Sequence, residues 1–119
     1  MPRIAVLTSG GDAPGMNAAI RAVVRQARAR GWEAFGVSHG FRGLMENQLR
    51  ALGPRDVGGI MQQGGTVLGS ARSEEFKTPE GQAHALGVLQ TQGIDSLVVI
   101  GGNGSQTGAN SLAELGFPV

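Results

Sequence analysis

The chain has 119 residues, 40% of them hydrophobic and 16% charged, which is the composition of a single globular domain. Its formal net charge of +1 gives no argument for nucleic acid or a membrane surface as a partner. The absence of cysteine excludes disulfides, thiolate nucleophiles and cysteine-ligated metals. The apolar runs are too short to cross a bilayer or to form a signal peptide, so we expect a cytoplasmic location.

Strand-like and helix-like segments alternate from the start of the chain. Residues 3–8 form an apolar run that predicts a buried strand, and the dense turn signal SGGDAPG follows it. Apolar residues at three- and four-residue spacing predict a helix over residues 16–30, with arginines on its opposite face. Residues 32–38 predict a second strand, HGFRG a loop, and residues 47–52 a weaker segment. The apolar face of the helix consists of Met16, Ala19, Ile20, Val23, Val24 and Ala27, and the arginine face of Arg21, Arg25 and Arg28.

The same alternation continues in the second half of the chain. A proline opens a short predicted helix over residues 54–62, and the glycine-rich connection GGTVLGSAR follows it. A long helix is predicted over residues 78–91, a third clear strand over 96–100 and a last helix over 105–115. This order predicts a three-layer α/β fold, with a mainly parallel sheet and helices on both faces. Residues 117–119 resemble the start of another strand, so we expect the chain to stop inside its fold.

Two glycine-rich turns follow predicted parallel strands and lead into helices. The first spans residues 9–15 and the second residues 101–105. Ligands of open parallel α/β sheets bind at the carboxyl ends of the strands, and free N–H groups at a helix N-terminus attract phosphate. One such turn is consistent with a simple strand-to-helix connection. Two at the same edge of the sheet favour phosphate binding.

Short motifs narrow the class of phosphate ligand. The chain contains no GxxxxGK[ST], which excludes a P-loop enzyme. GNGSQTG has its third glycine one residue too late for the dinucleotide-binding fingerprint, and no acid ends the second strand to hold a ribose. GGNGS after a buried strand instead resembles the GGDG nucleotide signature of phosphofructokinases and of lipid and NAD kinases with a related fold.

Three segments together resemble the bacterial ATP-dependent 6-phosphofructokinases. They are TSGGDAPGMNAAIR (residues 8–21), GGTVLGSAR (64–72) and GIDSLVVIGGNGS (93–105), in the family's order and without long gaps. The resemblance implies the Rossmann-like half of that fold, with residues 1–119 as an N-terminal ATP-binding domain truncated at its C-terminal end. It also implies transfer of the ATP γ-phosphoryl group to the 1-hydroxyl of fructose 6-phosphate, giving fructose 1,6-bisphosphate in glycolysis. The family is usually a regulated homotetramer.

The resemblance implies the residues that bind ATP. Gly11 would offer its backbone to the phosphates, and Arg72 would stabilise charge on the transferring phosphoryl group. Gly104 favours ATP as the donor, because pyrophosphate-using enzymes resemble GGDDS, whose second acid crowds the nucleotide α-phosphate. The implied ATP-binding residues are Gly11, Arg72, Ser73, Gly102, Asn103, Gly104 and Ser105.

Asn103 is the main departure from the family pattern, which has Asp near the Mg²⁺ that bridges the ATP phosphates. Asn keeps an oxygen ligand but removes a negative charge, so coordination of Mg²⁺ would weaken. Three interpretations stay open. ATP and residues outside the chain hold the metal, the enzyme is slow, or the protein is a catalytically weakened, regulatory nucleotide-binding relative.

Arg21 and Arg25, one helical turn apart, match the family's site for the phosphates of an allosteric effector, ADP or phosphoenolpyruvate, at a subunit interface. Without the resemblance, a solvated helix face is the usual role of such a pair. Bacterial relatives often carry Arg where this chain has Pro54, and Arg55 is the neighbour that would substitute, so the identity of the effector stays open. The implied effector residues are Arg21, Arg25, Arg55 and Gly59.

The family's catalytic base is an Asp in a TIDND-like segment that would follow residue 119, and the residues that bind fructose 6-phosphate lie later still. We therefore expect the 119-residue chain alone to show no measurable kinase activity. Another kinase with a GGxGS nucleotide turn is an alternative, against which the match over residues 8–21 argues.

Overall fold

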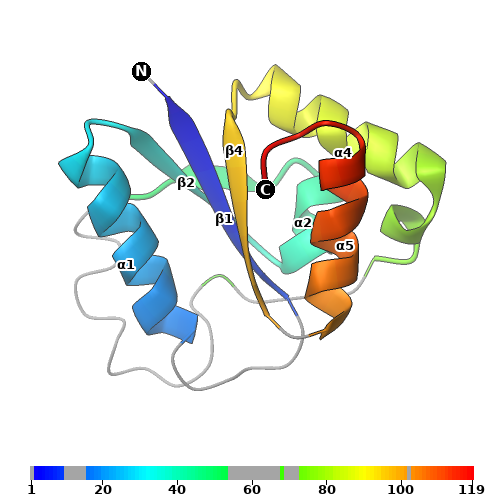
Figure 1. The fold of residues 1–119 in the computed structure, drawn as a ribbon, viewed down its shortest axis with the longest axis horizontal. Helices are drawn as coiled ribbons and strands as arrows, with labels where there is room; N and C mark the ends of the chain where they lie inside the picture. The colour runs from blue at the N-terminus through cyan, green and yellow to red at the C-terminus, as the bar shows by residue number, and fades with distance from the viewer. Residues whose placement is uncertain (1, 10–15, 54–67, 69–72, 102) are drawn as a thin grey trace.

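A four-stranded sheet between two layers of helices forms the described part of the chain (Figure 1). The computed structural model describes residues 2–9, 16–53, 68, 73–101 and 103–119, and for residues 103–106 it describes only the backbone. The strands are β1 (Arg3–Ser9), β2 (Glu33–Val37), β3 (Leu49–Ala51) and β4 (Ser96–Gly101). The helices are α1 (Met16–Ala29), α2 (Gly40–Met45), α4 (Pro79–Thr91) and α5 (Asn103–Glu114), and η2 (Glu75–Lys77) is a 3-10 turn.

The strands lie in the order β3-β2-β1-β4. β1 pairs in parallel with β2, beginning at Arg3 opposite Glu33, and in parallel with β4, ending at Ser9 opposite Gly101. β3 pairs antiparallel with β2. β1 is therefore flanked by a parallel strand on each side and covered on both faces, which explains why its central residues are almost completely buried.

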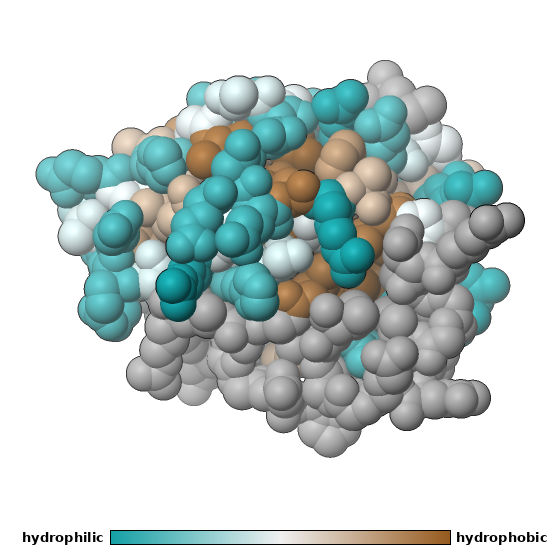
Figure 2. Space-filling model, turned by 180° about the vertical axis from the view of Figure 1, so that it is seen from behind, coloured by the Kyte–Doolittle hydropathy of each residue, from teal (hydrophilic) through white to brown (hydrophobic). Residues whose placement is uncertain are grey.

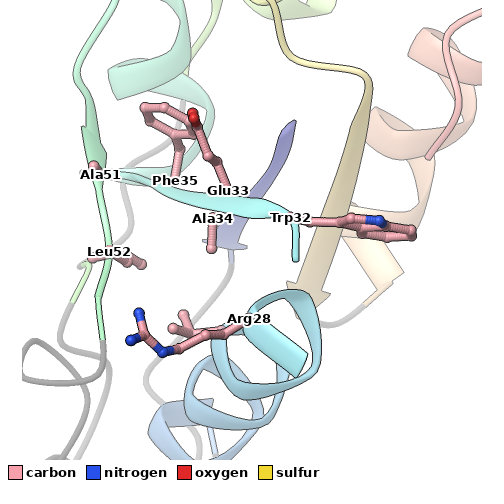
Figure 3. A pocket seen from close by; sticks show the side chains of 8 residues that line it. Arg28, Trp32, Glu33, Ala34, Phe35, Ala51 and Leu52 are labelled. Atoms are coloured by element: carbon pink, nitrogen blue, oxygen red, sulfur yellow. The ribbon is translucent and has the colours of Figure 1, made fainter. Parts of the chain in front are cut away.

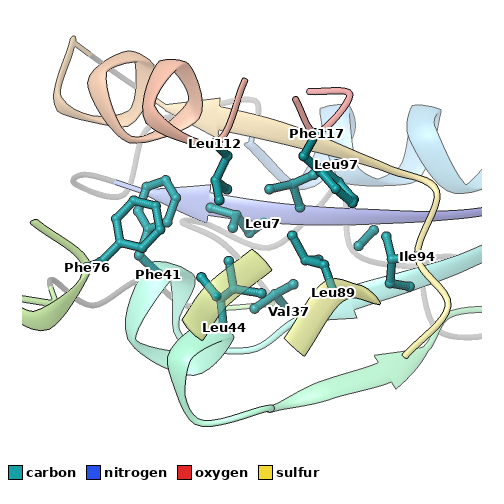
Figure 4. Close-up of a cluster of buried hydrophobic side chains, with 12 residues drawn as sticks. Leu7, Val37, Phe41, Leu44, Phe76, Leu89, Ile94, Leu97, Leu112 and Phe117 are labelled. Atoms are coloured by element: carbon teal, nitrogen blue, oxygen red, sulfur yellow. The ribbon is translucent and has the colours of Figure 1, made fainter. Parts of the chain in front are cut away.

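Each face of the sheet has its own apolar core. On one face, α1 packs Ile20 and Val24 against Val6 of β1 and Ala34 of β2. Successive strand residues point to opposite faces, so Leu7 belongs to the other core, which α2, α4 and α5 cover (Figure 4). Full burial of such a side chain contributes about 1.5–3 kcal/mol. This second core contains Leu7, Val37, Phe41, Leu44, Phe76, Leu89, Ile94, Leu97, Leu112 and Phe117.

The predicted α/β fold class is confirmed, and the three clear predicted strands are confirmed as β1, β2 and β4. The first predicted helix is α1, which ends one residue earlier than predicted, at Ala29. α4 begins at Pro79, because the Thr78 hydroxyl accepts a hydrogen bond from the Gly81 N–H at 3.0 Å and caps it. α5 begins at Asn103, two residues before the predicted start. The predicted helix over residues 54–62 lies outside the described residues.

The loop predicted at HGFRG is wrong, because the chain forms α2 there. His39 and Gly40 both have left-handed backbone angles, with φ of 64° and 58°, and they turn the chain directly from β2 into the helix. Phe41 and Leu44 then lie one helical turn apart, and both are buried in the core shared with α4. The helix is thus stabilised by tertiary packing, since six residues with two glycines have little helix propensity of their own.

Candidate functional site

The carboxyl ends of β1 and β4 lie side by side. Ser9, the last residue of β1, is paired with Gly101, the last residue of β4. The two glycine-rich turns of the sequence therefore leave the sheet at the same edge, and α1 and α5 both begin there (Figure 1). This is the edge at which open parallel sheets bind ligands. Gly11 and Gly102 themselves lie outside the described residues.

α5 begins immediately after this edge. Asn103, Gly104 and Ser105 all lie in its first turn, where the backbone N–H groups have no partner within the helix. These N–H groups and the positive end of the helix dipole suit an anionic group. Three of the predicted ATP-binding residues are thus brought to one helix N-terminus.

Arg72 lies outside the described residues, and its neighbour Ser73 is described. The Ser73 hydroxyl oxygen accepts a hydrogen bond from the backbone N–H of Phe76 at 3.2 Å. Ser73, one residue before the N-cap Glu74, is therefore bonded to the turn η2.

A stacked pair of phenylalanines beside α5 is the feature that the sequence did not predict. The rings of Phe41 from α2 and Phe76 from η2 have centroids 4.4 Å apart and planes inclined by 17° (Figure 4). The pair lies against Gly108 of α5, where a Cβ would be only 2.7 Å from Phe41 Cζ. The stack therefore sets how closely α5 approaches α2 and η2. Gly108, a single glycine inside the helix predicted over residues 105–115, was the only sign in the sequence that a neighbour packs closely against that helix.

The two predicted effector arginines lie one helical turn apart around the middle of α1. Arg25 is exposed, whereas Arg21 is half-buried. Ile20 and Val24, the residues just before them, face the core, so the pair lies at the margin of the buried stripe. Arg28 continues this surface toward the C-terminus of the helix. Arg55 and Gly59, the other half of the predicted site, lie outside the described residues.

Two shallow hollows lie beside α1, on the face of the sheet that this helix covers. The first, of about 210 Å³, lies between α1, the start of β2 and the end of β3 (Figure 3). The second, of about 250 Å³, lies between α1 and β4. Figure 2 shows the face turned away in Figure 1, where apolar surface is exposed between polar side chains. The first hollow is lined by Val24, Arg28, Trp32, Glu33, Ala34, Phe35, Ala51 and Leu52.

The described residues contain no group of three or more His, Asp or Glu side chains that could hold a metal. His84 instead has its Nε2 atom 2.9 Å from the Met45 carbonyl oxygen, so it links α4 to α2. Within the same part of the chain, no helix has the length and apolar character that a membrane span requires.

Sequence relatives cover this chain from end to end. An ATP-dependent 6-phosphofructokinase of Oceanobacillus iheyensis is 57% identical over 118 residues, which are 99% of this chain and 37% of the relative. An ATP-dependent 6-phosphofructokinase 1 of Thermus thermophilus is 57% identical over 120 residues, with 100% and 37% covered. The chain thus spans little more than a third of the length of these relatives.

The solved structures that resemble this chain are also phosphofructokinases. A phosphofructokinase from Saccharomyces cerevisiae superposes with a TM-score of 0.92 at 49% identity, covering 96% of this chain and 16% of that one. A pyrophosphate-dependent phosphofructokinase from Marinobacter aquaeolei superposes with a TM-score of 0.85 at 19% identity, covering 100% and 32%, which shows the shared fold alone. The sequence model of the family described as phosphofructokinase matches residues 3–119. The chain therefore belongs to the phosphofructokinase family.

Proposed function

We propose that the full-length protein transfers the γ-phosphoryl group of ATP to the 1-hydroxyl of fructose 6-phosphate. The observation that supports this most directly is the pairing of Ser9 with Gly101, which brings two glycine-rich turns and two helix N-termini to one edge. The 57% identity to ATP-dependent 6-phosphofructokinases supports the choice of substrates. The whole activity requires residues beyond this chain, because a catalytic base and a sugar-phosphate site are also needed.

In the proposed reaction, the sugar hydroxyl oxygen attacks the γ-phosphorus while the bond to the bridging oxygen of ADP breaks. The hydroxyl proton passes to a base outside this chain. Gly11 and the Gly102–Ser105 turn hold the polyphosphate by backbone N–H groups, and Arg72 stabilises charge on the equatorial oxygens of the moving phosphoryl group. Gly104 leaves space for the nucleotide α-phosphate. Catalysis is then positioning combined with charge stabilisation.

Asn103 would offer one uncharged oxygen ligand to a Mg²⁺ ion that arrives with ATP. Asn103 begins α5 beside the end of β4 and carries an oxygen ligand, and the described residues offer no cluster of carboxylates to hold an ion alone. A bound Mg²⁺ ion would supply neutralisation of the polyphosphate charge. The chain's own contribution is to orient the polyphosphate along the first turn of α5.

Regulation, assembly and location are part of the same proposal. Arg21, Arg25, Arg55 and Gly59 bind the phosphates of ADP or phosphoenolpyruvate between subunits of a cytoplasmic homotetramer. The exposure of Arg25 on α1 is consistent with a ligand approaching from outside the domain. Arginine suits this role, because its planar guanidinium donates two parallel hydrogen bonds to phosphate.

The test is a steady-state assay of the full-length protein with ATP and fructose 6-phosphate, with both products measured directly. We expect fructose 1,6-bisphosphate and ADP in equal amounts, and a loss of kcat of about 10³-fold in Arg72→Ala. Arg28→Ala, on the outer face of α1, is the matched control and keeps full activity. Phosphorylation of NAD or a lipid in place of the sugar would contradict the proposal.

Asn103 favours one second candidate, a regulatory relative that binds nucleotide without turnover. In that case the full-length protein binds ATP, measured by calorimetry, but forms no fructose 1,6-bisphosphate at any Mg²⁺ concentration. Robust wild-type turnover dismisses this candidate.

A further inference from the structure

Asn103 and Gly104, the first two residues of α5, form the one Asn-Gly pair in the chain. An asparagine before glycine is prone to deamidation, because the backbone nitrogen of the glycine attacks the side-chain amide carbon of the asparagine. A Cβ on the second residue hinders this attack, and glycine has none. The reacting atoms belong to adjacent residues, so covalent connection alone keeps them within reach of one another.

The backbone at the start of α5 leaves this pair reactive. The Gly104 N–H lies in the first turn and has no partner within the helix, so no intrahelical bond holds its nitrogen. Ring closure turns the Asn103 backbone out of helical geometry, which at the first helical residue disturbs only a helix end. Gly101 before the pair and Thr107 after it are both exposed, so the pair is flanked by solvent.

The three other asparagines of the chain lack these conditions. Each of them precedes a residue that carries a Cβ. Asn17 is only 3% exposed. Asn47 and Asn110 hold their side-chain amides in hydrogen bonds of 2.9 and 3.1 Å to other side chains. Asn103 therefore differs from all three in the residue that follows it.

We propose that Asn103 is a self-modification site, at which spontaneous deamidation converts the asparagine to aspartate. The Gly104 nitrogen gives up its proton and bonds to the side-chain amide carbon of Asn103. The bond from that carbon to the amide nitrogen breaks, and ammonia leaves. Water, the one co-reactant, then opens the five-membered succinimide ring. Cleavage of the new bond gives aspartate, whereas cleavage of the original peptide bond gives isoaspartate, which adds one atom to the main chain.

The consequence for the metal rests on the proposed function. A carboxylate on the first residue of α5 is a better ligand for Mg²⁺ than an amide oxygen, because it is charged. A nucleotide bound by the first-turn N–H groups would also occupy the Gly104 N–H and slow ring closure. The age of the protein and its nucleotide occupancy therefore set how much of it carries the charged ligand.

The test follows the full-length protein during incubation at mildly alkaline pH. Mass spectrometry of its proteolytic fragments measures a gain of about 1 Da at each asparagine. We expect the gain at Asn103 and none at Asn47 or Asn110, which are internal controls in the same sample. Gly104→Ala adds a Cβ beside the attacking nitrogen, and Asn103→Gln requires a larger ring, so both should suppress the gain. Saturating ATP should slow it severalfold.

Two results would overturn the inference. One is an unchanged Asn103 in the folded protein after the time in which the chain unfolded in guanidinium is fully converted. The other is equal conversion of Asn103 and Asn110. A gain in mass that ATP does not slow would count against the proposed nucleotide edge instead, because the modification itself needs no ligand.

An activity measurement tests the consequence separately. The Mg²⁺ concentration for half-maximal rate in the aged wild type should fall toward that of Asn103→Asp, whereas in Asn103→Gln it should not change with age. A wild type that gains the mass at Asn103 and keeps its original Mg²⁺ requirement would refute the link between this modification and the metal.

Discussion

The guanidinium of Arg3 pairs with the carboxylate of Glu33 across the first residues of β1 and β2, with Nε 2.9 Å from Oε2. The same guanidinium donates to the carbonyl oxygen of Gln92 at 2.9 Å and lies 5.5 Å from the ring centroid of Phe35. The Arg3 backbone N–H also donates to the carboxylate of Asp95 at 2.7 Å. One side chain thus joins β1 to β2 and to the turn before β4, at the edge opposite the proposed nucleotide site.

Arg3→Ala is expected to lower the free energy of unfolding by about 1–2 kcal/mol, mainly through the lost hydrogen bond to Gln92 and the lost contact with Phe35. The ion pair itself contributes at most about 1 kcal/mol, because its side chains are 42% and 43% exposed. Arg42→Ala is the control. It removes the exposed pair with Glu46 at 3.5 Å and should cost about 0.5 kcal/mol or less. Urea denaturation measures the free energy of unfolding of both variants. An equal loss in the two would contradict the role of Arg3 in joining β1 to β2 and to the turn before β4.

Two glycines of α4 should respond in opposite directions to the same substitution. A Cβ on Gly81 would overlap the carbonyl oxygen of Glu75, a backbone atom that cannot move aside, so Gly81→Ala should destabilise the protein by about 3 kcal/mol. Gly87 has no neighbour within 4 Å, and Gly87→Ala should stabilise the helix by about 0.5–1 kcal/mol. Thermal unfolding of the two variants is the measurement. A higher melting temperature in both variants would show that the backbone around Gly81 can make room for a methyl group.

The strands were predictable because each combines an apolar run with a glycine-rich or polar boundary. Residues 3–8 and 96–100 are short runs of this kind, and the structure confirms both within one residue. α1 was predictable from periodicity, since Ile20, Val24 and Ala27 recur at helical spacing and are all buried. These signals are local, so one sequence suffices to find them.

The features that were missed depend on contacts between distant residues. α2 forms because Phe41 and Leu44 are buried under α4, and Gly43 leaves no room for a side chain beside the Ser38 carbonyl oxygen. The stack of Phe41 on Phe76 joins residues 35 positions apart, and nothing near either residue in sequence predicts it. At the site, the motifs predicted which turns share an edge. They did not predict what fixes α5 against its neighbours.

Gly108→Ala tests the contact of α5 with the stacked rings of Phe41 and Phe76. The added methyl group would lie 2.7 Å from Phe41 Cζ and 3.1 Å from Phe76 Cε2, so it should push α5 away from the stacked rings. We expect a loss of about 1–3 kcal/mol in stability and severalfold weaker binding of ATP by calorimetry. The double variant Gly108→Ala/Phe41→Leu removes the atom that clashes and should recover part of both losses. No recovery would indicate that Gly108 matters for another reason.

The effector proposal predicts a difference between two arginines on the same surface of α1. Arg25→Ala should raise the effector concentration for half-maximal response about tenfold or more, because a charge-assisted hydrogen bond to phosphate contributes about 1.5–3 kcal/mol. Arg28→Ala, one turn further along the exposed side, should change it less than about twofold. Titrations of activity with ADP and with phosphoenolpyruvate give both values. A response unchanged in Arg25→Ala would leave α1 as an ordinary solvated helix face.

If the proposed function is right, Asn103→Asp should lower the Mg²⁺ concentration that the full-length protein needs for activity. Asn103 is the first residue of α5, directly after the β4 edge, and a carboxylate there adds the charged oxygen ligand that Mg²⁺ prefers. The helix N-terminus also favours that charge by about 0.3–1 kcal/mol, so the variant should not lose stability. We expect the Mg²⁺ concentration for half-maximal rate to fall by roughly threefold to tenfold at saturating ATP, since one added carboxylate ligand is a difference of about 1 kcal/mol.

Asn110→Asp is the matched control for this change, because it adds the same charge to the same helix two turns away. Its amide donates to Glu114 at 3.1 Å, so the new carboxylate would meet a like charge and slightly destabilise the C-terminal half of α5. The added charge and the slight loss of helix stability are both far from the first turn of α5. The dependence of the rate on Mg²⁺ concentration should therefore match that of the wild type. If Asn103→Asp behaves like this control, the ion is held by ATP and residues elsewhere. The prediction for position 103 then fails, whereas the proposal that α5 binds the polyphosphate through its backbone N–H groups is not affected.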